Sequence, residues 1–213
     1  TLEGGSGANA LTGGDGDDLL QGRGGAAALD GGFGTATASY LSSLGGVTVS
    51  LATGTGTGAD ADGDTLTDIE ILSGSNFADV LTTANTGSTL FGNGGDDTLN
   101  GGDGNDSIEG GADDDVLAGG LGADTLAGGA SDGDTLDYSA SNAAVTVDLA
   151  TNTNSGGHAQ GDVISGIENV TGSAFTDRLT GSAGDNELDG GALDDTLEGG
   201  GGADRLIGGG GSA

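Results

Sequence analysis

The sequence predicts an all-β fold, a β-solenoid of stacked 18-residue coils with interleaved β-rich spacers. The first observation is a nine-residue repeat, which over residues 92–127 gives GNGGDDTLN, GGDGNDSIE, GGADDDVLA and GGLGADTLA. The second is composition, since 213 residues include 51 glycines, four Phe, two Tyr and no proline. So few large apolar side chains cannot build a close-packed core of the usual kind. A fixed register of small units favours a repeat architecture instead.

Each nine is interpreted as a six-residue turn followed by a three-residue strand. Alternate side chains of a strand face opposite ways, so the eighth-place Leu or Ile points inward and its neighbours point out. Two nines then close one flattened coil, and coils stack about 4.8 Å apart. The predicted core residues of the best repeats are Leu99, Ile108, Leu117 and Leu126.

The blocks of nines alternate with two spacers along the chain. The expected segments are a first block (1–39), a spacer (40–73), a second block (74–137), a second spacer (138–171) and a third block (172–213). The second spacer repeats the first without a gap at an offset of 98 residues. The spacers are predicted to form strands, at 47–53 and 63–73 in the first copy, with Leu66, Ile69 and Ile71 facing inward. Nothing resembles a domain linker, so one elongated solenoid is expected.

The glycine turns carry the candidate chemistry. Glycine permits a backbone that exposes carbonyl oxygens, and the sixth-place Asp adds a carboxylate. Turns of repeats i and i+2 stack on one edge, where a cation could collect six or more oxygens, as Ca²⁺ requires. One histidine and no cysteine argue against Zn²⁺. The expected sixth-place ligands are Asp18, Asp79, Asp97, Asp106, Asp115, Asp124, Asp134, Asp177, Asn186, Asp195 and Asp204. The expected carbonyl ligands are those of Gly92, Gly94, Gly101, Asp103, Gly110, Ala112, Gly119 and Leu121.

The same spacing predicts which ligands act together. The expected pairs are 79 with 97, 97 with 115, 106 with 124, 115 with 134, 177 with 195, and 186 with 204. Asp18 would face Ala36 and Asn9 would face Ala27, so the first block is expected to bind weakly or not at all. Asp64 and Asp162, in matching spacer loops, are candidates for an additional Ca²⁺ or for turn capping. Tyr40 and Tyr138 are expected to fill the core.

The charge excludes several classes of function. Thirty-four acids face three arginines, for a net charge of −31, which argues against nucleic acid and anionic membranes as partners.

No apolar run is long enough to cross a membrane, so no membrane insertion is expected. No G-x-S-x-G, H-E-x-x-H or nucleophile–histidine arrangement is found, so the chain is predicted not to be an enzyme. It begins at Thr1 rather than Met, which favours a fragment or a processed product.

The nonapeptide G-G-x-G-x-D-x-U-x, with U apolar, resembles that of the RTX (repeats-in-toxin) family, which binds Ca²⁺. The resemblance covers the three blocks, more than half of the chain. It implies a parallel β-roll, export by the type I secretion machinery of a Gram-negative bacterium, and folding outside the cell, or at its surface, when calcium is met. Departures are Ala27 and Ala36, which lack the ligand, and Asp113 and Leu193, which replace the fourth-place glycine.

Three functions remain open from the sequence. The first is a calcium-binding structural module of a secreted or surface protein. The second is a component that self-associates in a surface layer, an adhesin or a filament. The third is the accessory region of a secreted hydrolase or epimerase.

Overall fold

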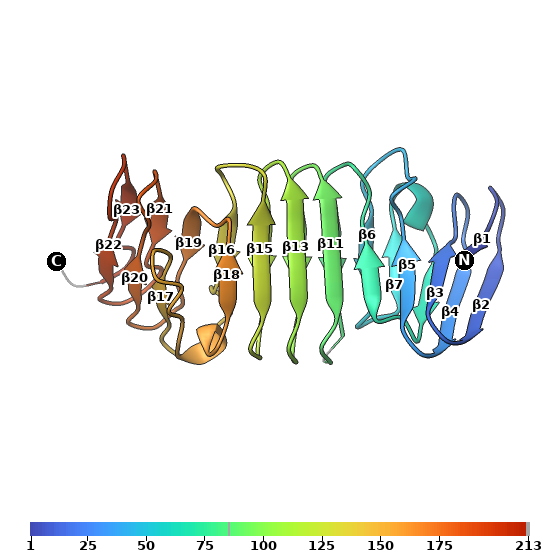
Figure 1. Ribbon diagram of the computed structural model, residues 1–213, viewed down its shortest axis with the longest axis horizontal. Helices are drawn as coiled ribbons and strands as arrows, with labels where there is room; N and C mark the ends of the chain where they lie inside the picture. The colour runs from blue at the N-terminus through green and yellow to red at the C-terminus, as the bar shows by residue number, and fades with distance from the viewer. Residues whose placement is uncertain (85, 212–213) are drawn as a thin grey trace.

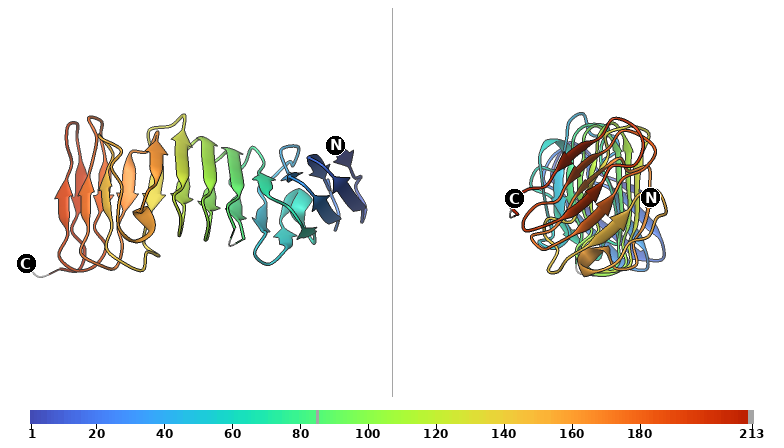
Figure 2. Two further views of the ribbon diagram at one scale, coloured as in Figure 1. Left: turned by 60° about the horizontal axis from the view of Figure 1, so that its bottom comes forward. Right: turned by 90° about the vertical axis from the view of Figure 1, so that its left-hand side faces the viewer.

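The computed structural model describes residues 1–84 and 86–211, which form an elongated rod with its two ends at opposite extremes of the long axis (Figures 1 and 2). Within the blocks of nines, successive strands alternate between two faces, and each strand pairs in parallel with the strand one coil further along. The fold is therefore the expected parallel β-roll. The last two residues of the predicted third block lie outside the described residues.

Three sheets make up the two faces. One sheet contains, in spatial order, β1 (Leu2–Glu3), β3 (Asp18–Gln21), β5 (Ala36–Ser39), β9 (Ile71–Ser73), β11 (Thr89–Gly94), β13 (Ser107–Ala112), β15 (Thr125–Gly129) and β18 (Val163–Ser165). The second contains β2 (Ala10–Asp15), β4 (Ala28–Phe33), β8 (Thr65–Thr67), β7 (Thr55–Thr57), β6 (Thr48–Ser50), β10 (Val80–Thr82), β12 (Thr98–Asn100), β14 (Val116–Ala118), β16 (Thr135–Asp137), β19 (Asn169–Thr171), β21 (Glu187–Asp189) and β23 (Arg205–Ile207). The third contains β17 (Thr146–Asp148), β20 (Arg178–Thr180) and β22 (Thr196–Glu198).

The eighth-place residues form the core as two facing ladders. Leu99 pairs with Leu117 in one sheet and Leu90 pairs with Ile108 in the other, each at an offset of 18 residues. These four side chains are at most 1% exposed. The ten-residue unit at the end of the second block keeps this register, because its extra residue lies in the turn and Leu117 pairs with Leu136. The core is thus one residue thick on each face and continuous across the unit.

The first spacer breaks the regular coil. After β5 the chain crosses to the second sheet, where β6 pairs in parallel with β10. It then doubles back through β7, which pairs antiparallel with both β6 and β8, before β8 joins β4 in parallel. A short 3₁₀ helix, η1 (Ala59–Ala61), lies between β7 and β8. The spacer therefore places three strands between β4 and β10, where the opposite face has only β9.

The second spacer has the same plan on the opposite face. Its strands β17 and β18 and its 3₁₀ helix η2 (Gly157–Ala159) are the 98-residue counterparts of β6, β8 and η1. Here β18 extends the sheet that holds β15, whereas β8 belongs to the sheet that holds β4. The two spacers lie on opposite faces because the second block contributes an odd number of strands, the seven from β10 to β16, and these strands alternate between the faces. Figure 1 accordingly draws η1 in the upper half of the rod and η2 at its lower edge.

One expectation about the first spacer is wrong. Ile71 was expected to face inward, but Leu72 is fully buried and pairs with Leu90, while Ile71 flanks it and is only partly buried. The other two expected residues, Leu66 and Ile69, contribute to the core, Ile69 partly buried. The strand is therefore set by its pairing with β5 and β11 rather than by its own alternation.

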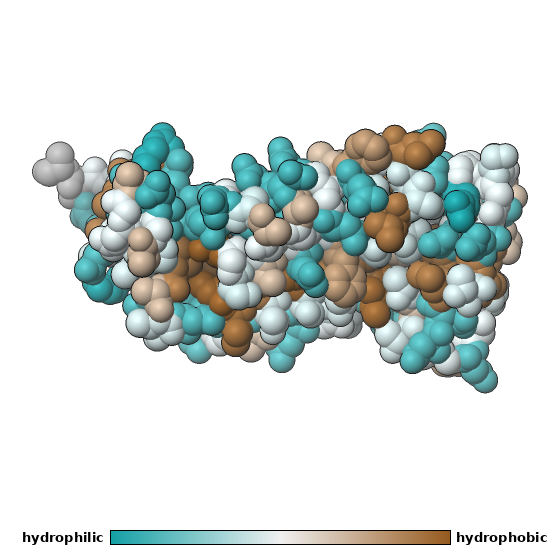
Figure 3. All heavy atoms as spheres, turned by 45° about the horizontal axis from the view of Figure 1, so that its top comes forward, coloured by the Kyte–Doolittle hydropathy of each residue, from teal (hydrophilic) through white to brown (hydrophobic). Residues whose placement is uncertain are grey.

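The outer surface is mixed. On the face drawn in Figure 3, hydrophobic spots are interrupted by hydrophilic residues along the whole rod. Single large apolar side chains such as Phe33 and Leu44 are exposed, at 83% and 92%. Among residues 1–84 and 86–211, no helix has the length and hydropathy needed to cross a membrane.

Candidate calcium sites at the edges of the roll

The turns stack in two columns, one along each edge of the roll. The first edge holds turns that lead into the face of β11, β13 and β15, with Ser88, Asp106 and Asp124 at the sixth place. The second edge holds turns that lead into β10, β12, β14 and β16, with sixth-place residues Asp79, Asp97, Asp115 and Asp134. Alternate repeats therefore share an edge, as the spacing predicts.

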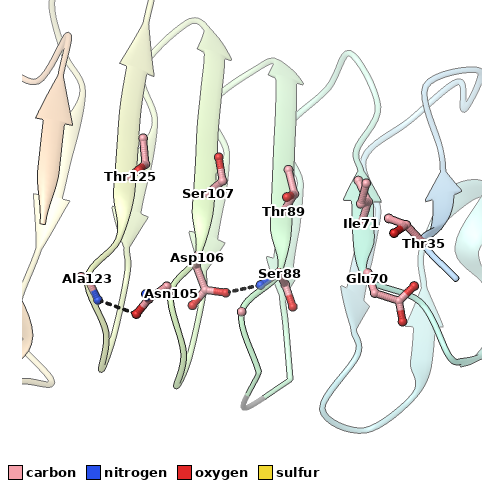
Figure 4. A pocket seen from close by; sticks show the side chains of 11 residues that line it. Thr35, Glu70, Ile71, Ser88, Thr89, Asn105, Asp106, Ser107, Ala123 and Thr125 are labelled. Carbon is pink, nitrogen blue, oxygen red and sulfur yellow. Dashed lines mark hydrogen bonds between the residues drawn. The ribbon is translucent and has the colours of Figure 1, made fainter. Parts of the chain in front are cut away.

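One carboxylate oxygen of each sixth-place Asp from Asp79 onward binds the preceding coil. Asp115 Oδ1 accepts the backbone N–H of Asp97 at 2.9 Å, and Asp124 Oδ1 accepts that of Asp106 at 2.9 Å. Figure 4 shows the same bond from Ser88 N–H to Asp106. The structure brings together all six expected pairs in this way, at nitrogen–oxygen distances from 2.8 to 3.1 Å.

The second carboxylate oxygen has no protein partner in many of these turns. Buried Oδ2 atoms without a hydrogen bond belong to Asp97, Asp106, Asp115, Asp124, Asp134 and Asp195. An unpaired buried charge is costly, so each such atom calls for a cation or a proton. Six aligned instances point to a repeated ligand rather than to a local defect.

Backbone carbonyls face the same places. A Cβ added to Gly92 would meet both Asp97 Oδ2 and the carbonyl oxygen of Gly110, one coil further on. The same holds at Gly101, with Asp106 Oδ2 and the Gly119 carbonyl, and at Gly110, with Asp115 Oδ2 and the Gly128 carbonyl. The first-place glycine leaves room for these oxygens to converge. Such an all-oxygen set fits Ca²⁺.

The third-place residues that were expected to offer carbonyls lie in the stacked turns. Gly94 pairs with Ala112, and Asp103 forms a bridge with Leu121. The Leu121 carbonyl already accepts the N–H of Gly104 at 2.7 Å, which leaves one lone pair for a cation. No group of three acidic, His or Cys side chains suited to a metal occurs within the described residues. A cation at these edges must therefore take many of its oxygens from the backbone.

Burial changes the acidity of the ligands. It raises the pKa of Asp97 to about 7, with smaller contributions from the neighbouring charges of Asp79 and Asp115. It raises the pKa of Asp106 and of Asp115 to about 6. The cause is the cost of a desolvated charge, which a bound cation would remove. At neutral pH without a cation, these carboxylates favour proton uptake or unfolding.

Three expected ligand turns have a different structure, which we term closed turns: 74–79, 172–177 and 181–186. Each has Ser at the second place. In the first, Asp79 Oδ2 accepts the Ser75 backbone N–H at 2.5 Å and Oδ1 accepts both the Ser75 hydroxyl and the Val47 N–H. Asp177 is held in the same way by Ser173 and Val145. The structure thus gives Asp79 and Asp177 protein partners for both oxygens.

Asn186 is also satisfied by the protein. Its Oδ1 accepts the Ser182 N–H at 2.7 Å, and its Nδ2 donates to the Glu168 carbonyl at 2.7 Å. An amide N–H directed at a carbonyl occupies a place where a cation would otherwise bind. The expectation that Asn186 is a ligand is not supported by these contacts.

The backbone explains the difference between turns. In the turns with an unpaired Oδ2, which we term open turns, the second-place residue has positive φ: Asn93, Gly102, Gly111, Gly120, Gly129 and Gly191, between 81° and 136°. No residue with positive φ occurs among the described residues of the closed turns. There the serine hydroxyl accepts the N–H two residues on, as in Phe77 N–H to Ser75 at 3.1 Å. The fourth-place departures do not disrupt the open turns, since Asp113 and Leu193 adopt φ of 75° and 72°.

The remaining expected ligands, Asp18 and Asp204, lie near the ends of the columns of stacked turns. Asp18 pairs with Ala36, so no second carboxylate faces it there. Ala27 N–H binds Asp64 Oδ1 rather than a ligand Asp of a nonapeptide. Asp204 receives the Asn186 N–H and is partly exposed.

The spacer carboxylates continue both columns in a manner that the sequence did not reveal. Asp162 Oδ1 accepts the Asp124 N–H at 3.0 Å, and its Oδ2 accepts the buried Tyr138 hydroxyl at 2.7 Å. Asp64 is bound in the same way by Ala27 N–H and Tyr40. Their contacts are those of turn capping.

Glu70 and Glu168 take sixth-place positions too, accepting the N–H of Ala36 and of Asp134. Their alignment at offset 98 was visible in sequence, but their role was not.

Comparison with known families agrees with this geometry. The model of the RTX calcium-binding nonapeptide repeat (4 copies) matches residues 1–37, 91–126, 101–136, 162–197 and 192–212. These ranges cover more than half of the chain, which therefore belongs to the RTX calcium-binding nonapeptide repeat family. No curated protein matches the chain.

Proposed function

We propose that this chain is a calcium-loaded structural module of a secreted or surface-exposed bacterial protein, and that it folds when it binds Ca²⁺. The observation that carries the proposal is the set of six buried, unpaired Asp Oδ2 atoms in the open turns. The first-place glycine carbonyls that face several of them support an all-oxygen site. When bound, Ca²⁺ supplies charge neutralisation and cross-links adjacent coils.

The chain's own residues explain why folding would depend on the ion. With a net charge of −31, the compact chain repels itself. Its core is a thin double ladder of Leu and Ile, which cannot offset six carboxylates whose buried Oδ2 atoms lack partners. Binding free energy would then become folding free energy. Sites of extracellular modules have dissociation constants of roughly 10⁻⁴ to 10⁻³ M, so the chain would stay unfolded at low calcium inside a cell.

An unfolded chain suits passage through a narrow channel. We therefore propose export through type I secretion machinery, followed by folding in a calcium-rich exterior. The family membership supports this part of the proposal, which also follows from the calcium-dependent folding proposed above. Detecting the chain in the medium of producing cells, with and without that exporter, tests it.

The module is proposed to have a mechanical rather than a catalytic role. The side chains that converge at the edges are satisfied by backbone donors or directed at cation positions, and they form no nucleophile–base pair. A stack of cross-linked coils would form a stiff rod. Self-association into a surface layer or filament would be an additional property, to be read from sedimentation of the calcium-loaded chain.

Titration of the calcium-stripped chain tests the central proposal. Far-ultraviolet circular dichroism should change from coil to β as Ca²⁺ reaches the millimolar range, and equilibrium dialysis should count several ions per chain. Mg²⁺ at equal concentration is the control, since it dehydrates reluctantly and requires stricter geometry. A β spectrum that persists in excess chelator would falsify calcium-dependent folding.

A further inference from the structure

The junction between the second block and the second spacer contains a carboxylate pair outside the nonapeptides. Asp134 is fully buried, and its Oδ2 has no hydrogen-bond partner. Its Oδ1 accepts the Asp115 N–H at 2.9 Å, as in every other open turn. Its own N–H donates to Glu168 Oε2 at 3.2 Å. Glu168 thus takes the position that the next sixth-place Asp holds elsewhere in the column.

The backbone oxygen of an open turn is reproduced at this junction. A Cβ added to Gly128 would meet Asp134 Oδ2 and the carbonyl oxygen of Gly166. At Gly110 the corresponding atoms are Asp115 Oδ2 and the Gly128 carbonyl. Gly166 has φ of 57° and lies in the spacer, yet its carbonyl faces the same place as a first-place glycine carbonyl.

We infer that Asp134, the Gly166 carbonyl and the Glu168 carboxylate form an additional Ca²⁺ site, so that the spacer completes the last site of the second block. This inference rests on the proposed function. Glu168 has two carboxylate oxygens with about four lone pairs, and the Asp134 N–H uses one of them. It therefore supplies negative charge at the backbone N–H of Asp134, the residue whose Oδ2 is unpaired.

The run of acidic sixth-place residues is interrupted immediately beyond this site. The following sixth-place residue is Asn186, whose Nδ2 donates to the Glu168 carbonyl at 2.7 Å. A neutral amide with its own serine partner replaces the next carboxylate. The spacer glutamate is therefore the last acidic residue of the column before Asn186.

The first spacer provides an internal comparison. Glu70 is the counterpart of Glu168 and accepts the Ala36 N–H at 2.8 Å. The Asp68 carbonyl faces the Cβ position of Gly31, as the Gly166 carbonyl faces that of Gly128. Ala36 stands where the second junction has Asp134 and brings no carboxylate. The first junction has the glutamate and the carbonyl but lacks the unpaired oxygen, so it should bind no ion.

Counting ions in matched variants of the full chain tests the inference. Glu168→Ala and Glu70→Ala each remove one acceptor for a backbone N–H. Equilibrium dialysis at a calcium concentration that just saturates the parent chain should show one ion fewer in Glu168→Ala and no change in Glu70→Ala. Circular dichroism at the same calcium concentration checks that each variant is folded.

A gain-of-site variant keeps the test decisive if Glu168→Ala does not fold. Ala36→Asp should add one ion per chain, and combining it with Glu70→Ala should remove that ion again. Equal counts in the two glutamate variants, or no added ion in folded Ala36→Asp, would overturn the inference. If the parent chain itself binds no Ca²⁺, the proposed function fails instead.

Discussion

The turns around Asp79 and Asp115 occupy the same edge of the roll, yet they handle a buried carboxylate in opposite ways. Asp79 finds every partner within the protein, in the Ser75 N–H, the Ser75 hydroxyl and the Val47 N–H. Asp115 binds one N–H and leaves Oδ2 buried and unpaired. The sixth-place Asp therefore does not by itself set how the carboxylate is held. The two kinds of turn differ at the second place, where the residue has positive φ in the open turns and is Ser in the closed turns.

The roll therefore contains two kinds of turn, closed and open. Closed turns at Gly74 and Gly172 each begin a block directly after a spacer, and both oxygens of their sixth-place Asp are hydrogen-bonded within the protein. Open turns make up the rest of the second block, apart from the nine that carries Ser88 at its sixth place, and each leaves a buried Oδ2 without a protein partner. Calcium should therefore act most strongly on the middle of the rod, while both block starts keep local hydrogen bonds of their own.

The largest effects on unfolding free energy should come from replacing a sixth-place Asp, either in an open turn or in a closed turn. Asp115→Ala should lose at least one bound ion, which costs about 2.7 kcal/mol of unfolding free energy at calcium ~100 times the dissociation constant. Asp79→Ala should also destabilise, since each unpaired buried donor costs about 1–3 kcal/mol, but should keep the ion count. Urea unfolding at fixed calcium together with equilibrium dialysis measures both. Equal ion loss in the two variants would contradict the division.

Protons should partly replace calcium at the open turns. The folded-state pKa values of Asp97, Asp106 and Asp115 are raised to about 7, 6 and 6, above the ordinary value for an unfolded Asp. Their contribution to stability is then fully present below about pH 4 and is lost as pH rises through 6 to 7. Without calcium, β content measured by circular dichroism should increase as pH falls from 7.5 to 5. A calcium-stripped Asp97→Asn/Asp106→Asn/Asp115→Asn chain should show more β structure at pH 7.5 and less pH dependence; unchanged behaviour would reject the explanation.

Replacing the second-place Ser by Gly should convert a closed turn into an open turn. Ser75→Gly and Ser173→Gly remove the hydroxyl that holds the turn and permit positive φ at the second place, so each should add one weakly bound ion at high calcium. Ser182→Gly is the matched control, because its sixth-place residue is the neutral Asn186. Calcium counts at 10- and 100-fold excess over the parent midpoint measure the gain. An ion added by Ser182→Gly, or none by the other two, would show that the serine does not set the type of turn.

The smallest effect concerns turn strain at the fourth place. Leu193 has φ of 72° and is 51% exposed, so Leu193→Gly relieves the strain while losing little buried area. The gain should be about 1 kcal/mol of unfolding free energy at saturating calcium. Leu193→Ala keeps the strain and should not stabilise. Thermal unfolding of both variants decides, and a gain in Leu193→Ala alone would assign the effect to the exposed side chain.

The nine-residue register was enough to predict the fold, the buried Leu and Ile ladders and the pairing of alternate turns, because each property depends only on spacing. It did not distinguish open from closed turns, although the Gly-Ser start of three nines carried that information. It missed Glu168 because a spacer residue enters the column only after the chain has folded back through β17 and β18. Ile71 was misplaced because pairing with two neighbouring strands, rather than local alternation, sets which residue of β9 is buried.

The odd number of strands between the spacers has a consequence for the shape of longer arrays. The first spacer adds two extra strands to one face, and the second adds one extra strand and an isolated bridge to the other, so each should act as a wedge that tilts the coils on either side of it. Because seven strands separate the copies, the second wedge lies on the opposite face and its tilt opposes the first. Deleting or adding a single nine between them would place both wedges on one face, and an array built that way should curve into an arc instead of extending as a rod.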